Sequence, residues 1–180
     1  MSTLKIPIGV DDHVQGRPDV PISIVEYGDY ECPGCGLAYP IVKAVQKHFG
    51  GNLRFVFRNF PLAQIHPNAE TAAETAEWAG SEGRFWQMHD SLYENQGLLG
   101  LPLYCALAQG LGFSEAALAE ALESRSFHPR VRQDFMGGVR SGVNGTPTFF
   151  INGRRHDGSY EFGHLVAAID RAFGRNDTKN

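Results

Sequence analysis

The chain has 180 residues, of which 42% are hydrophobic and 20% charged, proportions that are ordinary for one globular domain with a sizeable core. Its formal net charge of −4, with no run of Lys or Arg longer than two, gives no indication of a nucleic-acid surface. No apolar window approaches the length of a membrane span, and three cysteines are too few for a disulfide-stapled scaffold.

The first nine residues have no long apolar segment and no cleavage signal, so the chain as written is expected to be cytoplasmic. Removal of a signal segment would instead make it periplasmic or otherwise extracytoplasmic. In a reducing compartment, a closely spaced cysteine pair is more often catalytic or metal-binding than structural.

The first part of the chain predicts a strand, a helix and a second strand after a polar arm. Residues 1–19 are polar and rich in Gly, Asp and Pro, and they suggest an arm or a short edge element. A short β-branched run over 22–27 predicts a buried strand. Apolar residues recur at helical spacing over 33–49, and alternation over 53–57 predicts the second strand.

The middle of the chain predicts only helices, and the last part returns to strands. The expected helices cover 67–80, 84–95, 101–110, a segment capped by Ser114, and 127–141. The turn sequence Asn152-Gly153 between two short runs predicts a β-hairpin. Its strands, and the amphipathic helix that follows, cover 148–151, 154–157 and 162–173.

The sequence Cys32-Pro33-Gly34-Cys35 stands between the first predicted strand and its helix. A C-x-x-C pair that ends a strand and opens a helix is typical of a redox dithiol. The free N–H groups and partial positive charge of a helix N-terminus stabilise a thiolate, which is the attacking species in disulfide exchange. The spacing also lets the second sulfur resolve a mixed disulfide. Cys32 and Cys35 are therefore the candidate catalytic residues.

Two other interpretations of this cysteine pair stay open. Cys-Pro-Gly-Cys-Gly matches half of a zinc ribbon, and a structural disulfide would use the same two residues. A zinc site needs two more ligands, but only Cys105 remains among the cysteines, and the histidines show no H-x-x-x-H pattern. We therefore predict no metal. Because no phosphate-binding glycine fingerprint is present, we predict no nucleotide or flavin cofactor either.

Several segments resemble a known protein family. Residues 25–35 and 142–150 resemble the two active-site motifs of DsbA-like proteins in the thioredoxin superfamily. Residues 58–62 and 158–162 resemble a bacterial subgroup that is found as stand-alone proteins and as antiporter fusions. The resemblance covers about residues 10–174.

This resemblance implies an α/β thioredoxin fold, β-α-β followed by β-β-α, with an inserted helical subdomain. The expected division is 1–62 for the N-terminal arm and first half of the fold, 63–141 for the insertion, and 142–180 for the second half and C-terminal helix. The implied activity is exchange with protein or peptide thiols and disulfides, with a redox partner that recycles the dithiol. Neither nucleic acid nor membrane is an expected partner. A glutathione-dependent transferase or isomerase is the alternative on this scaffold, although such relatives typically have serine in place of the first cysteine.

The resemblance also implies a substrate-binding surface. Pro147 matches the family's cis-proline, which lies against the C-x-x-C segment. The backbone of Thr146 would pair with an extended substrate, as in strand addition. Pro33 and Gly34 would lie at the same surface.

Glu26 stands six residues before Cys32, where the family has a buried acid behind the dithiol. Such a carboxyl has a raised pKa and can exchange a proton with Cys35. The chain departs from strongly oxidising members at Gly34, where they carry histidine. Cys32 should therefore be less acidic than in those members, and the reduction potential should be intermediate. Thr146 resembles the isomerase and reductase members, which also speaks against a purely oxidising role.

Four other residues receive structural interpretations. Cys105 is expected to be a buried core thiol. Trp78 and Trp86 are expected in the core of the insertion, and His66 at the entry to a helix.

Overall fold

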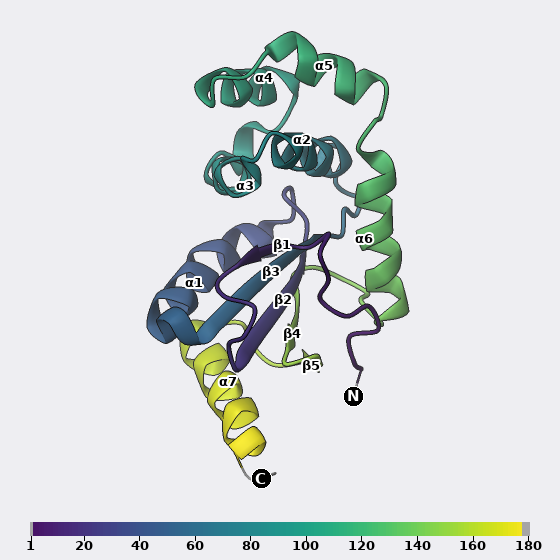
Figure 1. Ribbon diagram of the computed structural model, residues 1–180. Helices are drawn as coiled ribbons and strands as arrows, with labels where there is room; N and C mark the ends of the chain where they lie inside the picture. The colour runs from purple at the N-terminus through teal and green to yellow at the C-terminus, as the bar shows by residue number, and fades with distance from the viewer. Residues whose placement is uncertain (1, 178–180) are drawn as a thin grey trace.

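The computed structural model describes residues 2–177 and contains a mixed sheet with helices around it (Figure 1). The elements are β1 (His13–Gln15), β2 (Ile22–Gly28), α1 (Pro33–Phe49), η1 (Gly50–Asn52), β3 (Leu53–Asn59), α2 (Ala69–Ser81), α3 (Phe85–Glu94), η2 (Gln96–Leu98), α4 (Leu101–Gly110), α5 (Glu115–Glu123), α6 (His128–Arg140), β4 (Thr148–Ile151), β5 (Arg154–His156) and α7 (Phe162–Asp177).

The predicted elements are confirmed in type and order. β3 extends two residues beyond its expected end, because Arg58 and Asn59 still pair with β2. The Ser114 cap is also confirmed, since its hydroxyl accepts a 3.2 Å hydrogen bond from the Ala117 N–H at the start of α5. The polar arm contributes the edge strand β1.

The sheet has five strands in the order β1-β3-β2-β4-β5. β2 and β3 are parallel, and the other neighbouring pairs are antiparallel. This is the thioredoxin arrangement that the family resemblance implies. Because β2 and β3 are parallel, the segments that follow them leave the sheet at the same edge. The Cys32–Cys35 segment follows β2, so it lies beside the loop that follows β3.

Different helices cover the two faces of the sheet (Figure 1). Ile22 and Ile24 of β2 face the larger core, which also holds α1 and α7. Val25 and Tyr27 face a smaller core beside α6 and the N-terminal arm. Side chains alternate along a strand, so Glu26 points to the same face as Ile24, toward α1. This alternation places a carboxyl beneath the helix that carries the dithiol.

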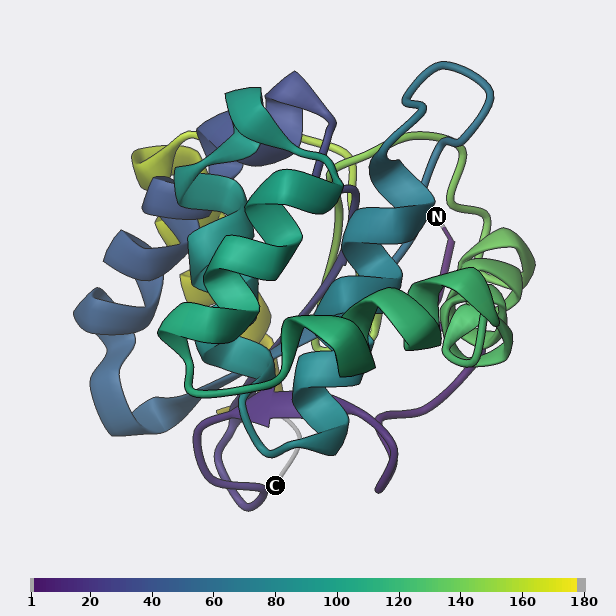
Figure 2. The same ribbon diagram turned by 90° about the horizontal axis from the view of Figure 1, so that it is seen from above.

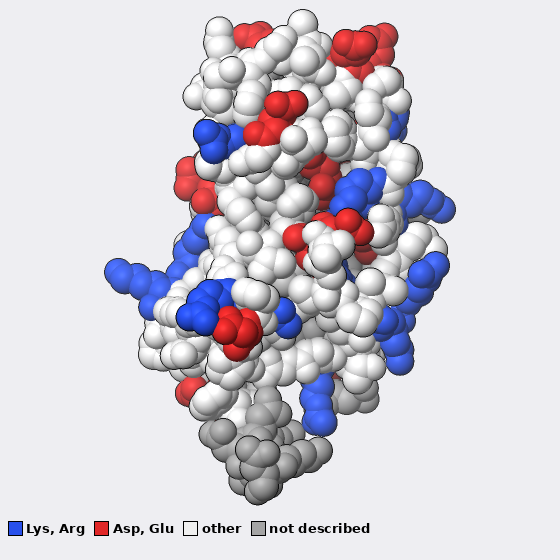
Figure 3. Space-filling model, viewed as in Figure 1, with Lys and Arg blue, Asp and Glu red and all other residues white. Residues whose placement is uncertain are grey.

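Helices α2 to α5 form a layer over one edge of the sheet (Figures 1 and 2). The chain leaves the sheet after β3 and returns to it at β4. The division of the chain into three parts, with boundaries at 62/63 and 141/142, stays a prediction. On the face shown in Figure 3, acidic and basic side chains are interspersed rather than gathered into one large surface.

The structure corrects one sequence interpretation and confirms two others. Cys105 is only half-buried, because α4 turns Tyr104 and Ala108 into the core and leaves Cys105 on its flank. The prediction of a buried core thiol is therefore wrong. Trp78 is buried in the larger core, as expected. The half-buried Trp86 packs against the same core.

Candidate functional site

Cys32 and Cys35 lie at the junction of β2 and α1. Cys32 is the N-cap residue of α1, and Pro33 begins the helix. Both cysteines are free thiols; Cys32 is 8% exposed and Cys35 is completely buried. The backbone N–H of Asp29 donates to Cys35 Sγ at 3.4 Å. Of the two sulfurs, that of Cys32 is therefore the one that a second molecule can reach.

The two thiols differ strongly in acidity. The pKa of Cys32 is lowered to about 5, mainly because the Cys35 thiol donates a hydrogen bond to its sulfur. Burial opposes this shift, whereas hydrogen bonds with Thr146 and with two backbone N–H groups add to it. One of those N–H groups belongs to Gly34, which supplies a donor rather than a charge. Burial, followed by the bond to Cys32, raises the pKa of Cys35 well above its usual value. At neutral pH the pair is a thiolate next to a thiol.

Glu26 lies behind the pair and is 3% exposed. Burial, followed by the negative charge of Cys32, raises its pKa to about 8. The charge of Glu26 in turn contributes to the raised pKa of Cys35. The carboxyl and the buried thiol therefore influence each other's protonation.

The loop before β4 closes the other side of the site. The Thr146–Pro147 peptide bond is cis, and Cys32 Sγ lies 3.3 Å from the Thr146 carbonyl oxygen. A Cβ added at Gly34 would lie 3.3 Å from Pro147 Cδ and 3.6 Å from the Tyr160 hydroxyl. Exposed Pro33 completes this surface.

Two residues that hold this site in place are absent from the sequence prediction. Gln96 Nε2 donates to the carbonyl oxygens of Tyr30 and Cys32 at 2.8 and 2.9 Å. Asp29 is buried, and its carboxylate accepts hydrogen bonds from the loop that follows β3. No local sequence pattern indicates Gln96, because it reaches the dithiol from the insertion. Asp29, three residues before Cys32, could have been singled out as an acid near a predicted thiolate.

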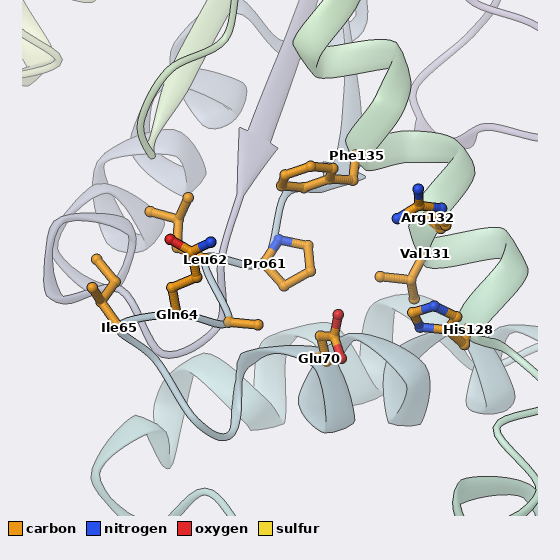
Figure 4. Close-up of a pocket in the computed structure, with 10 residues that line it drawn as sticks. Pro61, Leu62, Gln64, Ile65, Glu70, His128, Val131, Arg132 and Phe135 are labelled. Atoms are coloured by element: carbon orange, nitrogen blue, oxygen red, sulfur yellow. The ribbon is translucent and has the colours of Figure 1, made fainter.

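A pocket of about 370 Å³ lies between the loop after β3, α2 and α6 (Figure 4). Leu62, whose N–H binds Asp29, forms part of its wall, and the pocket therefore adjoins the support of the dithiol. In Figure 4, Pro61 faces α6, and three polar side chains, Glu70, His128 and Arg132, lie together on the α2–α6 side. The full lining is Pro61, Leu62, Ala63, Gln64, Ile65, Glu70, His128, Val131, Arg132 and Phe135.

Comparison with known proteins assigns the family. A family model described as thioredoxin matches residues 9–171. A thioredoxin-like oxidoreductase from Silicibacter pomeroyi DSS-3 superposes with a TM-score of 0.79 at 26% identity, covering 91% of this chain and 93% of the other. The α-DsbA1 protein of Wolbachia pipientis shares the fold, with a TM-score of 0.82 at 20% identity and coverage of 98% and 97%. The chain belongs to the thioredoxin family.

The chain also matches part of much longer proteins. It is 45% identical over 171 residues to the Na⁺/H⁺ antiporter NhaA 1 of Salinispora arenicola, covering 94% of this chain but 26% of the antiporter. It thus spans about a quarter of the length of the curated relatives it matches. Within residues 2–177, none of the helices combines the length and apolar character that a membrane crossing needs. No group of three or more potential metal ligands gathers within that range.

Proposed function

We propose that this thioredoxin-family oxidoreductase exchanges disulfides with protein or peptide thiols through Cys32 and Cys35. The observation that supports this best is the asymmetry of the pair: Cys32 is the more exposed sulfur and is ionised near neutral pH, whereas Cys35 is enclosed and keeps its proton. Thiol–disulfide exchange needs this combination, with one nucleophile ready to attack and one thiol held in reserve.

In the reductive direction, the Cys32 thiolate attacks one sulfur of the substrate disulfide. The substrate S–S bond breaks, a bond between Cys32 and the substrate sulfur forms, and the other substrate sulfur leaves as a thiolate. Glu26, partly ionised near its pKa of about 8, then takes the proton of Cys35. The Cys35 thiolate attacks Cys32 and releases the second substrate thiolate. Two electrons pass to the substrate, and the chain is left with a Cys32–Cys35 disulfide; oxidation of a dithiol runs the same steps backwards.

The substrate would lie along the loop before β4. An extended peptide can pair with the backbone of Thr146 and rest against Pro147, as in strand addition to a sheet edge. Pro33 and Gly34 form the opposite side of this contact. Such backbone pairing suits a range of protein sequences, so the proposed partners are protein substrates and a redox protein that recycles the dithiol.

Cysteine variants test this scheme. Cys35→Ser should accumulate mixed disulfides with protein substrates, because the resolving thiol is missing, whereas Cys32→Ser should lose exchange altogether. Non-reducing electrophoresis and mass mapping of the trapped bond provide the measurement. Cys105→Ser is the matched control and should exchange like the parent. Turnover by Cys35→Ser at the parent rate would show that the two-step scheme is wrong.

A further inference from the structure

Asp29 connects the dithiol to the loop that follows β3. Its side chain is completely buried and accepts hydrogen bonds from the N–H groups of Glu31 and Leu62 at 2.8 and 2.9 Å. A third bond, of 2.8 Å, joins it to Nδ1 of His66, whose side chain is 16% exposed. The backbone N–H of Asp29 donates to Cys35 Sγ. One residue thus contacts both an imidazole and the resolving sulfur.

The charge of this pair depends on the proton of His66. A buried carboxylate near a dithiol opposes thiolate formation, because like charges repel strongly where water is excluded. Protonated His66 cancels the charge of Asp29, whereas neutral His66 leaves the charge of that carboxylate uncompensated. The charged groups that act on His66 are Asp29, Cys32 and Glu31.

The balance of these groups favours the imidazolium ion. Burial alone would lower the pKa of His66, but the bond to Asp29 and the charges of Asp29, Cys32 and Glu31 raise it above its usual value. Cys32 thus stabilises the proton on His66. Coupling between two sites is reciprocal, so the protonated imidazole stabilises the Cys32 thiolate by the same free energy.

We propose that His66, held by Asp29, is a positioning residue for the dithiol. Its positive charge sets the reduction potential of the Cys32–Cys35 pair and makes that potential depend on pH. The inference rests on the proposed function of the pair. Gly34, between the two cysteines, carries no charge. The loop that follows β3 joins an imidazole to Asp29, whose backbone N–H donates to Cys35 Sγ.

Two linked effects follow. The reduced chain carries a thiolate at Cys32 and the disulfide carries none, so His66 binds its proton more tightly in the reduced chain. Conversely, protonation of His66 favours the reduced form and makes the pair more oxidising. As the pH rises through the pKa of His66, the imidazole loses its proton. The reduction potential of the pair then falls by more than ionisation of the thiols alone would lower it.

The first test uses the unmodified chain. The ring-proton NMR signals of His66 are titrated in the chemically reduced and the oxidised protein. We expect the pKa of His66 to be higher in the reduced protein by about half a unit to one unit. Equal pKa values in the two redox states would overturn the inference.

The second test removes only the charge. His66→Asn places an amide donor near the position of Nδ1 and keeps the bond to Asp29. In glutathione buffers at pH 6, the variant should be about 3- to 10-fold less oxidising than the parent, and this difference should shrink at pH 9. His164→Asn, at an exposed histidine of α7, is the matched control and should leave the equilibrium constant unchanged.

The outcomes separate this inference from the proposed function. If parent and His66→Asn exchange with the same equilibrium constant at pH 6, the inference fails and the proposed function stands. If the parent shows no exchange, the proposed function fails, and the NMR titration of the chemically prepared states still decides whether His66 senses the dithiol.

Discussion

Cys32 and Cys35 are the same chemical group with opposite acid strengths, and their positions on α1 explain the difference. Cys32 occupies the N-cap position of the helix and accepts a hydrogen bond from Cys35, whereas Cys35 lies in the first turn and is fully enclosed. Cys32 loses its proton while Cys35 keeps its own, and the Cys35 thiol donates a hydrogen bond to the Cys32 thiolate. Each thiol therefore reinforces the protonation state of its neighbour.

The alkylation rate of the reduced chain should reveal this asymmetry. Labelling of Cys32 should rise with pH and be half-maximal near pH 5, and Cys35 should stay unlabelled at neutral pH. Iodoacetamide labelling followed by mass mapping provides the measurement. In the urea-unfolded control, both thiols should titrate near the ordinary value of about 8.5. Preferential labelling of Cys35 in the native chain would reverse the assignment of the nucleophile.

Glu26 should make the stability of the reduced chain depend on pH. Its pKa rises from 4.5 to about 8 on folding, so the folded state increasingly resists its ionisation as the pH rises between these values. Glu26→Gln removes this cost. The free energy of unfolding of the variant should match that of the parent near pH 4 and exceed it above pH 8. Between these values, the difference between the two proteins should grow by at most about 1.4 kcal/mol per pH unit.

Urea unfolding of both proteins at pH 4, 6 and 8.5 measures the difference. Glu161→Gln, at an exposed glutamate, is the control and should show no such trend. A constant difference between Glu26→Gln and the parent across this range would contradict the raised pKa.

At the scale of elements, the insertion reaches back to fix the start of α1. Gln96 in η2 donates to two carbonyl oxygens on either side of Glu31, in the segment that leads from β2 into the dithiol. Its amide also occupies the space beside Gly36, where an added Cβ would lie 2.2 Å from Gln96 Oε1. The helical layer therefore supports the active-site turn directly.

Gln96→Ala should therefore destabilise the chain and loosen this turn. The loss of two hydrogen bonds to partly buried carbonyls should lower the free energy of unfolding by about 1–3 kcal/mol. Hydrogen exchange should also become faster at the first N–H groups of α1. Gln87→Ala, at an exposed position of α3, should change neither measurement. Unchanged exchange and stability in Gln96→Ala would show that η2 does not hold the turn.

At the scale of the whole molecule, α6 packs closely against the sheet because it presents glycine there. A Cβ added at Gly138 would lie 2.6 Å from Phe60 Cδ2 and 3.0 Å from Tyr27 Cδ1. Both rings belong to the smaller core, so neither can move aside freely. This contact holds α6 against the smaller core.

Gly138→Ala should lower the free energy of unfolding by about 1–3 kcal/mol, because the added methyl overpacks the smaller core. Gly110→Ala is the matched control, since nothing lies within 4 Å of a Cβ at the end of α4. It should leave the stability unchanged or raise it by up to about 1 kcal/mol. Equal effects of the two substitutions would contradict the close packing of α6.

Local patterns in the sequence predict the elements well, because strand and helix periodicities are set by which residues face the core. Alternation along β2 also places Glu26 under α1. The bonds of Gln96 and of Asp29 to His66 could not be predicted, since they join segments that meet only after the chain folds. Cys105 was misplaced for a related reason: α4 is apolar on several sides, and only its packing decides which side is buried.

The reduction potential of the Cys32–Cys35 pair tests the central claim most directly. Equilibration of the chain in graded glutathione buffers, with mass analysis of the trapped thiols, measures it. The account predicts one reversible two-electron transition between roughly −120 mV, typical of strong oxidants, and roughly −270 mV, typical of thioredoxin. A potential below roughly −300 mV, as in structural disulfides, or the lack of a reversible transition would contradict a redox-active pair.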